Sequence, residues 1–158
     1  VKVDEMAEVL GDDKEKYIHI CFGVYGGLDG NIIFTMTRGM AIGLCDIMMG
    51  QSSGNTRPLE TTEISALKEV GNIVSASYLN SVSSMTGMSL LISVPDYNTG
   101  GYNQIKDLII SERGESSSSD DVVCVKTEFT QLELKIDGYL LFMPKKIGVD
   151  GFIKALGV

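Results

Sequence analysis

The order of hydrophobic and polar positions predicts a chain that alternates between strands and helices. Runs of β-branched and aromatic residues with alternating polarity predict strands at residues 17–25, 31–37, 88–94, 122–129 and 132–142. Apolar residues spaced three or four apart predict helices at residues 38–49, 61–87 and 147–156. The first two strands and the last two each form a hairpin. The expected class is α+β, rich in antiparallel pairs.

The segments between these elements carry weaker patterns. Residues 1–10 are mixed and are expected to be the end of a strand with a connection. We expect residues 96–101 to be a turn, and residues 102–110 to be either a short helix or an irregular segment. Turns or loops are also expected at residues 12–16, which are charged, 51–58, which are polar, and 115–121, which are acidic and expected to be mobile.

The helix expected at residues 61–87 has two different sides. At 100° per residue, Ser65, Glu69 and Asn72 fall within about 60° of one another. Thr61 or Thr62 is the expected N-cap, and Gly87 the expected stop. By itself, the polar stripe is typical of a solvated helix face. The opposing apolar stripe lies about 140° away and consists of Ile64, Leu67, Gly71, Val74, Tyr78, Val82 and Met85.

Composition limits the classes of function. The 158 residues suit one domain or one compact pair of half-domains, and 44% of them are hydrophobic, which is enough for a core. The net charge of −8 and the pI of about 4.6 argue against binding to nucleic acid or to anionic membranes. No apolar run is long enough to span a membrane, and the first residues have no signal-peptide pattern.

Cysteine and histidine usage argues against a metal site and against a histidine-dependent triad. Cys21, Cys45 and Cys124 are far apart, form no CxxC pair, and are expected to be buried small hydrophobes in a reducing cytosol. His19 is the only histidine, and its place in an apolar strand favours a structural role. A single histidine provides neither a Cys/His metal cluster nor a Ser–His–Asp triad.

The chain contains an internal repeat. Asp29-Gly-Asn-Ile-Ile-Phe34 is matched 108 residues later by Asp137-Gly-Tyr-Leu-Leu-Phe142, and a short helix follows each copy. Duplication explains this match, although Asp-Gly is also a common turn dipeptide. A long helix precedes the second copy, but nothing comparable precedes Tyr17. We therefore expect a bare apolar surface that another subunit covers, unless the chain is a fragment.

The spacing Ser65-x3-Glu69-x2-Asn72-x22-Pro95 resembles the active-site pattern of the CheC-like phosphatases of bacterial and archaeal chemotaxis, with their relatives CheX and FliY. The run Ala66-Leu-Lys-Glu-Val-Gly-Asn-Ile73 and the end of the chain also resemble this family, so the likeness extends from Tyr17 to Leu156. It implies a single pseudo-symmetric CheC-like domain over residues 1–158. CheC proteins usually carry two motifs, whereas this chain lacks the N-terminal helix with the first one.

The resemblance implies hydrolysis of the aspartyl phosphate of the receiver CheY. The side chain of Asn72 would position the attacking water, since a carboxamide both donates and accepts hydrogen bonds. Glu69 would pair with a receiver lysine; a role as general base is less favoured because an exposed glutamate ionises near about 4.3. Ser65 would help to cap the helix or make a secondary contact, and Pro95 would end its strand. Mg²⁺ is expected in the receiver, and this chain is expected to have no cofactor.

The same resemblance allows a function without catalysis. CheC relatives also bind the deamidase CheD, and some family members are flagellar switch components. A binding module for CheD or for phosphorylated CheY is therefore the alternative. CheX-like relatives dimerise through sheet edges, so a homodimer would also cover the face left by the missing helix. Within the long helix, the pair Gly71-Asn72 is locally unfavourable, which indicates either function or close packing.

Overall fold

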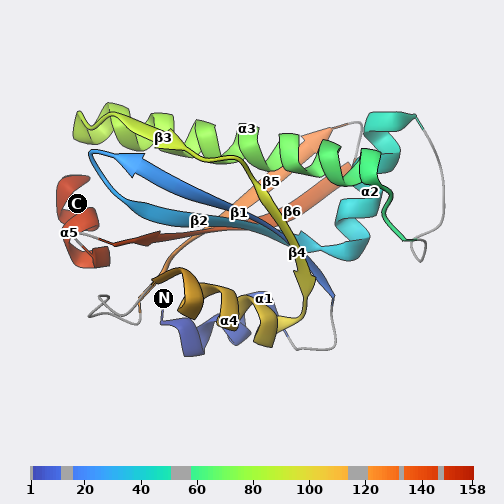
Figure 1. The fold of residues 1–158 in the computed structure, drawn as a ribbon, viewed down its shortest axis with the longest axis horizontal. Helices are drawn as coiled ribbons and strands as arrows, with labels where there is room; N and C mark the ends of the chain where they lie inside the picture. The colour runs from blue at the N-terminus through green and yellow to red at the C-terminus, as the bar shows by residue number, and fades with distance from the viewer. Residues whose placement is uncertain (1, 12–15, 51–57, 114–120, 132–133, 146–147) are drawn as a thin grey trace.

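Six antiparallel strands form one sheet in the computed structural model, which describes residues 2–11, 16–50, 58–113, 121–131, 134–145 and 148–158 (Figure 1). The strand order is β3-β1-β2-β6-β5, and β4 pairs with β1 beside β3. Both expected hairpins and the α+β class are confirmed. The strands are β1 (Tyr17–Gly26), β2 (Gly30–Thr37), β3 (Leu90–Ile92), β4 (Asp96–Gly100), β5 (Val123–Gln131) and β6 (Leu134–Pro144).

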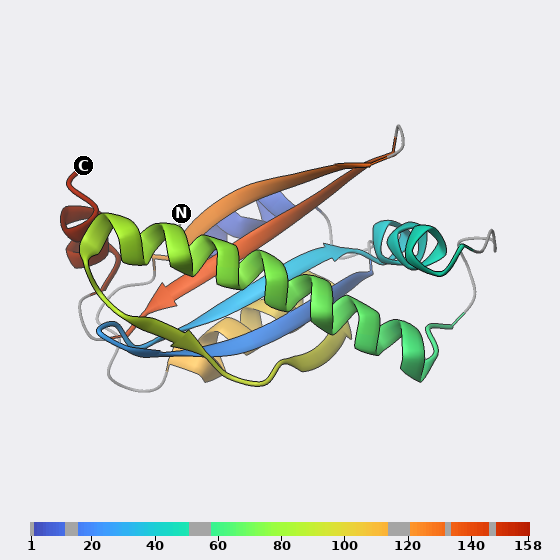
Figure 2. The same ribbon diagram turned by 90° about the horizontal axis from the view of Figure 1, so that it is seen from above.

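Helices cover both faces of the sheet. The long helix α3 (Thr61–Thr86) crosses one face, while α4 (Tyr102–Arg113) and the short α1 (Met6–Leu10) lie on the other (Figures 1 and 2). The helices that follow the two hairpins, α2 (Arg38–Met49) and α5 (Gly148–Ala155), lie at opposite ends of the sheet. Both were expected, as was the end of α2 at Gly50, which has a φ of 64°.

Alternation along the strands divides the apolar residues between two cores. In β2, Ile32 and Phe34 point towards α3, whereas Ile33 points towards α4 and α1. The core under α3 also contains Ile20 and Phe142. The opposite core contains Met6, Leu10, Ile105, Ile109 and Leu141. The face opposite α3 is therefore covered by this chain itself, and the expected bare surface is confined to part of the α3 side.

The N-terminal segment differs from the expectation. Residues 1–10 were expected to end a strand, but Val3–Glu5 form a 3-10 turn that leads into α1. Val3, Met6 and Leu10 recur every three or four residues and are all buried against the second core. A helix is the conformation that brings these three side chains to one face, so this prediction was wrong.

The segment after α3 also differs. Residues 96–101 were expected to be a turn, yet Asp96–Gly100 form β4 and pair with Tyr17–Cys21. The preceding strand is only Leu90–Ile92, which pairs with the other end of β1. Turn-like residues become a strand here because β1 presents a long edge whose hydrogen-bonding groups need partners. Residues 102–110 were expected to be either a short helix or an irregular segment, and they lie in the helix α4. The expectations for residues 12–15, 51–57 and 114–120 lie outside the described residues.

The two hairpins are related by a pseudo-two-fold axis. Ile33 pairs directly with Leu141, its own equivalent in the 108-residue repeat. On either side of this pair, Ile32 lies opposite Phe142, the equivalent of Phe34. In turn, Phe34 lies opposite Leu140, the equivalent of Ile32. The hairpin partners obey the same relation, because Cys21 lies opposite Ile33 and Cys124 opposite Leu141. The axis therefore passes through the Ile33–Leu141 pair, at right angles to the sheet.

Buried polar and sulfur groups have structural roles. His19 is fully buried, and its Nδ1 lies 2.8 Å from Thr35 Oγ1. Burial lowers the pKa of His19 to about 4, against the opposing effect of a backbone hydrogen bond with Gly100. Cys21 and Cys45 are buried and belong to no disulfide. Cys124 is half-buried, and burial raises the pKa of its thiol. Across the described ranges, no helix combines the length and apolarity needed to cross a membrane.

Candidate active site

Helix α3 is a fixed platform whose ends are both defined. Its N-cap is Glu60, earlier than the expected Thr61 or Thr62, and the Glu63 carboxylate accepts a hydrogen bond from the Glu60 N–H at 2.9 Å. The helix ends as expected at Gly87, whose φ of 72° lies in the left-handed region. The helix that carries Ser65, Glu69 and Asn72 is therefore defined at both ends by its backbone geometry.

The side of α3 that faces the sheet is a stripe of positions spaced four or three apart. Of the expected apolar stripe, only Leu67, Gly71 and Val82 are fully buried, and Met85 is 61% exposed in the last turn. Glu63, Ser75 and Leu79 are buried although the prediction did not include them. Val74 and Tyr78 are only half-buried, so the apolar arc of the helix is wider than its contact with the sheet. The buried positions are Glu63, Leu67, Gly71, Ser75, Leu79 and Val82.

Gly71 brings α3 close to the sheet. A Cβ at this position would lie 3.0 Å from Cγ2 and 3.1 Å from Cβ of Ile20, which is fully buried in β1. Even an alanine would therefore push the helix outward or displace the core. The unfavourable glycine beside Asn72 is thus explained by close packing, and Asn72 is the first residue to emerge from that contact.

The structure places Ser65, Glu69 and Asn72 together on the solvent side of α3. Glu69 and Ser65 are exposed, and Asn72 is half-buried beside Ala76. The Ser65 hydroxyl donates to the Thr61 carbonyl at 3.0 Å, which is a bond within the first turns of the helix and not a cap. Because this bond engages the Ser65 hydroxyl, the side chains of Glu69 and Asn72 are the groups of the stripe that another molecule can contact.

Pro95 lies outside the helix, in the connection between β3 and β4. It was expected to end its strand, but β3 already stops at Ile92, and Pro95 is half-buried directly before β4. Both strands pack along α3, which brings the connection to the flank of the helix (Figure 1). The structure thus brings three of the four motif residues onto one surface and places the fourth on an adjoining segment.

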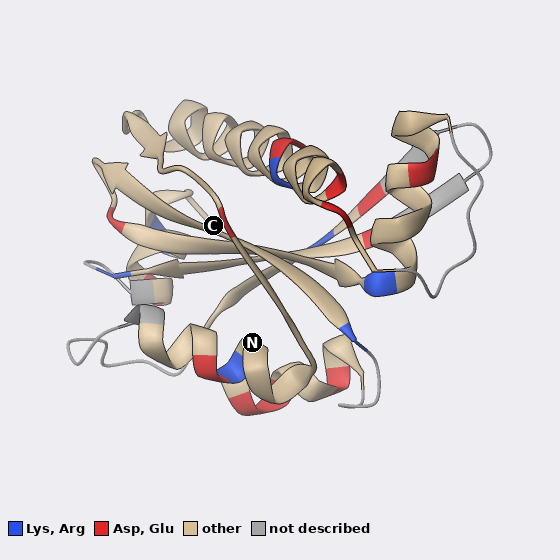
Figure 3. Ribbon diagram, turned by 45° about the vertical axis from the view of Figure 1, so that its right-hand side comes forward, with Lys and Arg blue, Asp and Glu red and all other residues tan. Residues whose placement is uncertain are grey.

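The exposed face of α3 beyond Glu69 carries no charge. The sequence from Val70 to Pro95 contains no Asp, Glu, Lys or Arg, although 22% of the whole chain is charged. In Figure 3 the coloured positions of α3 are confined to its N-terminal half. The hydroxyls of Ser81 and Ser84 bond to backbone carbonyls one turn back. A shallow hollow of about 530 Å³ runs along this face, lined by Asn72, Ile73, Ala76, Ser77, Asn80, Ser81 and Ser84.

Sequence reasoning missed this extended surface. It identified Asn72, but not Ser77 or Asn80 further along the same face. The signal was the absence of charge over residues 70–95, which a search for catalytic residue types does not register. An uncharged helix face in an acidic protein lets another molecule approach without the cost of removing water from charged side chains.

The comparisons with known proteins concern the segment that carries the motif and the fold as a whole. A model of the CheC-like family matches residues 63–98, the segment that contains all four motif residues. The fold is similar to that of Thermotoga maritima FliY, with a TM-score of 0.71 and 19% identity over 99% of this chain and 75% of that chain. Residues 63–98 are therefore similar to the CheC-like family, and the fold of the chain is similar to that of FliY.

Two CheX structures share the CheC-like fold. One is the CheX of a CheX–CheY–BeF₃–Mg²⁺ complex from Borrelia burgdorferi, with a TM-score of 0.54 and 18% identity over 87% of this chain and 80% of that chain. The other is the chemotaxis protein CheX from Desulfovibrio desulfuricans, with a TM-score of 0.53 and 16% identity over 90% and 93% of the two chains. At these identities the likeness shows the fold alone. The similarity to the CheC-like family comes from the match of the family model to residues 63–98.

Proposed function

We propose that this CheC-like protein hydrolyses the aspartyl phosphate of CheY, with Asn72 positioning the water. The observation that carries the proposal is that Glu69 and Asn72 emerge side by side from a helix fixed at both ends, next to a long uncharged face. The CheX structure in complex with CheY gives further support, because it belongs to a protein of the same fold. The proposal places the protein in the cytoplasm with its substrate.

The proposed reaction requires mainly that the protein place the reacting groups in the correct geometry. An acyl phosphate already has a good leaving group, so the rate depends on bringing a water in line with phosphorus and on stabilising the charge that develops. A carboxamide can hold such a water at any physiological pH because it does not titrate. Asn72 is half-buried and follows directly on the tight Gly71 contact, so its backbone cannot drift away from the docked phosphate. In this proposal Mg²⁺ belongs to the receiver.

Glu69 is placed to define how the receiver docks. Glu69 is exposed about one helical turn before Asn72. The helix face beyond Glu69 is uncharged. A lysine of the receiver that pairs with this carboxylate would fix both the position and the direction of approach.

The test is the release of phosphate from phosphorylated CheY. With catalytic amounts of this protein, we expect the phosphate to be lost faster than by the receiver's own hydrolysis. An unchanged rate, measured together with tight binding to phosphorylated CheY or to CheD, would favour the binding-module alternative. Binding to CheD that survives the loss of Asn72 would also show that this partner uses a different surface.

Replacement of Glu69 by glutamine separates its two possible roles. If Glu69 pairs with a receiver lysine, the variant should raise the KM for phosphorylated CheY roughly tenfold and leave kcat within about twofold. Steady-state kinetics over a range of CheY concentrations measure both constants. The control is Asp107→Asn, which removes an exposed carboxylate from α4 on the opposite face. A fall in kcat at unchanged KM would instead assign Glu69 the role of general base.

A further inference from the structure

A β-bulge separates β3 from β4 at the edge of the sheet. β3 ends opposite Val24 of β1, and β4 begins opposite Cys21. Two residues of β1 therefore face three residues of the connection, which are Ser93, Val94 and Pro95. One extra residue on one strand is the defining feature of a bulge, and bulges change the direction in which side chains point. We call these three residues the edge bulge.

Ser93 fixes the backbone of the edge bulge. Its N–H donates to the Gly23 carbonyl at 2.9 Å, and its hydroxyl accepts a hydrogen bond from the Gly23 N–H at 2.8 Å. The same hydroxyl donates to the Val94 carbonyl at 3.0 Å. Pro95 has no N–H, so it leaves no backbone donor without a partner. The backbone is thus held in place, whereas the Val94 side chain is 85% exposed and belongs to neither core.

The edge bulge lies beside the turn of α3 that carries Asn72. Gly71 packs on Ile20 of β1, and Ile20 pairs with Tyr97 of β4. Pro95 stands two residues before Tyr97, in the direction in which α3 continues from Gly71 (Figure 1). Figures 1 and 2 both show the connection between β3 and β4 passing alongside the middle of the helix. The edge bulge therefore adjoins the point where Asn72 emerges from the contact of α3 with the sheet.

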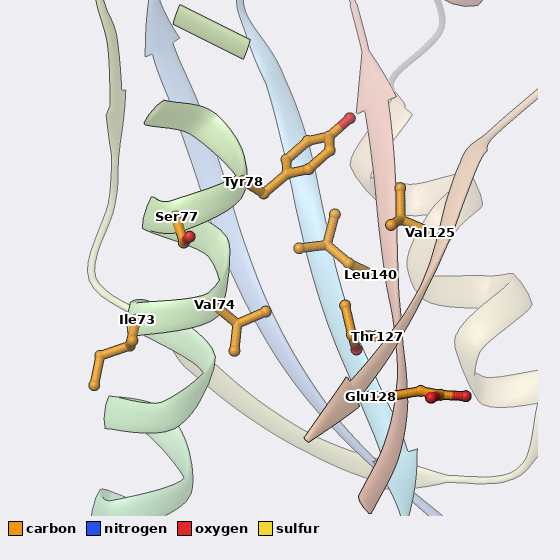
Figure 4. Close-up of a pocket in the computed structure, with 8 residues that line it drawn as sticks. All are labelled: Ile73, Val74, Ser77, Tyr78, Val125, Thr127, Glu128 and Leu140. Atoms are coloured by element: carbon orange, nitrogen blue, oxygen red, sulfur yellow. The ribbon is translucent and has the colours of Figure 1, made fainter. Parts of the chain in front are cut away.

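Asn72 also points to the correct side of α3. Figure 4 shows Val74 and Tyr78 projecting from the other flank of the helix towards β5 and β6. At 100° per residue, Asn72 is about 160° round the helix from Val74, with Glu69 on the solvent surface between them. β3 and β4 form the edge of the sheet opposite to β5. The surface therefore presents Glu69, then Asn72, then the edge bulge.

We propose that Val94 is a docking contact for the receiver, on the side of Asn72 opposite to Glu69. This contact presupposes the proposed function, because a receiver whose phosphate lies over Asn72 covers both flanks of that residue. Glu69 provides a charged contact on one flank, and Val94 provides an apolar contact on the other. Removing the exposed valine from water favours association when the receiver surface is apolar there. Val94 thus contributes to specificity, since a receiver with a charged residue at this place is a poor substrate.

The experiment measures binding separately from catalysis. CheY loaded with BeF₃⁻ and Mg²⁺, the form named in the Borrelia burgdorferi complex, is titrated with the intact protein to obtain the Kd. Phosphate release from phosphorylated CheY gives kcat and KM. We expect Val94→Ser to raise both the Kd and the KM about tenfold and to leave kcat within about twofold. Val94→Ile should restore the parent values, because it keeps an apolar side chain.

Two exposed apolar residues provide matched controls. Val158 has the same side chain and nearly the same exposure as Val94, at 88% against 85%, but follows α5. Leu91 is 67% exposed on the same edge of the sheet; it lies opposite Tyr25, which places it on the face away from α3. Val158→Ser and Leu91→Ser should both keep the Kd and the KM of the parent protein. Circular dichroism should give all these variants the parent's thermal midpoint, since their side chains are exposed.

The possible outcomes separate this contact from the phosphatase proposal. Val94→Ser with the parent's Kd and KM, or with the same loss as Leu91→Ser, would overturn the docking contact even if phosphate release is fast. Binding that depends on Val94 without faster phosphate release would support the contact and contradict the phosphatase proposal. A parent protein that does not bind the loaded CheY would contradict both. A dimer in sedimentation that Val94→Ser dissociates would assign Val94 to a second copy of the chain and overturn the inference.

Discussion

Replacing Asn72 with alanine is expected to slow phosphate release from phosphorylated CheY about 100-fold, to near the receiver's own rate. The methyl group can neither hold the in-line water nor donate to the developing charge. The substitution creates no cavity, because Asn72 lies on the solvent side of α3, and alanine is the better helix former. The thermal midpoint of the variant should therefore be equal to or above that of the parent protein. Both quantities are measured on the same samples.

Asn80 provides the matched control for this experiment. It is an exposed asparagine on the same helix and on the same uncharged face, two turns further along. Its backbone carbonyl accepts the hydrogen bond from Ser84, so truncation of the side chain leaves that bond intact. Asn80→Ala should keep the phosphatase rate within about threefold, since it removes a carboxamide from the surface but not from the reacting phosphate. A similar loss in both variants would contradict the role assigned to Asn72.

Replacing Phe142 with alanine is expected to lower the free energy of unfolding by about 3–5 kcal/mol. Phe142 is fully buried in β6, between β2 and β5. Its ring contacts Phe152 of α5 at 5.0 Å and Tyr78 of α3 at 6.1 Å between centroids, both edge to face. It therefore joins the sheet to both helices, and its loss leaves a cavity that neither helix can fill alone. A typical domain has only about 5–15 kcal/mol of stability in total.

Urea denaturation followed by circular dichroism measures this effect. The control is Phe142→Leu, which keeps most of the apolar volume and should cost about 1.5 kcal/mol or less. A loss below about 1 kcal/mol in the alanine variant would show that the site collapses around the smaller side chain. In that case the contacts of Phe142 with Tyr78 and Phe152 would not be what fixes α3 and α5 to the sheet.

The candidate motif was accessible from the sequence because its signal is local. Ser65, Glu69 and Asn72 lie on one helix, and a helix converts their spacing directly into a shared face. Pro95 was found through its spacing as well, but its position before β4 was not. That position depends on which strand pairs with the free edge of β1, and a pairing between distant residues leaves no pattern in the segment itself.

By itself, the sequence determined the elements whose pattern repeats over many residues: both hairpins, α2, α5 and the long α3 with its stop at Gly87. It also indicated the 108-residue repeat and placed Glu69 and Asn72 on one stripe of the helix. These features follow from local periodicity and backbone preferences, which neighbouring residues fix among themselves. The stripe alone, however, was compatible with an ordinary solvated helix face.

Only the tertiary structure decided what surrounds that stripe. Contact with Ile20 explains Gly71, burial against the second core makes a helix of Met6–Leu10, and the exposed edge of β1 makes a strand of Asp96–Gly100. The pairing of Ile33 with Leu141 showed that the sequence repeat corresponds to a pseudo-two-fold axis of the sheet. Each of these depends on residues far apart in the chain, because burial and strand pairing are settled between elements and not within them.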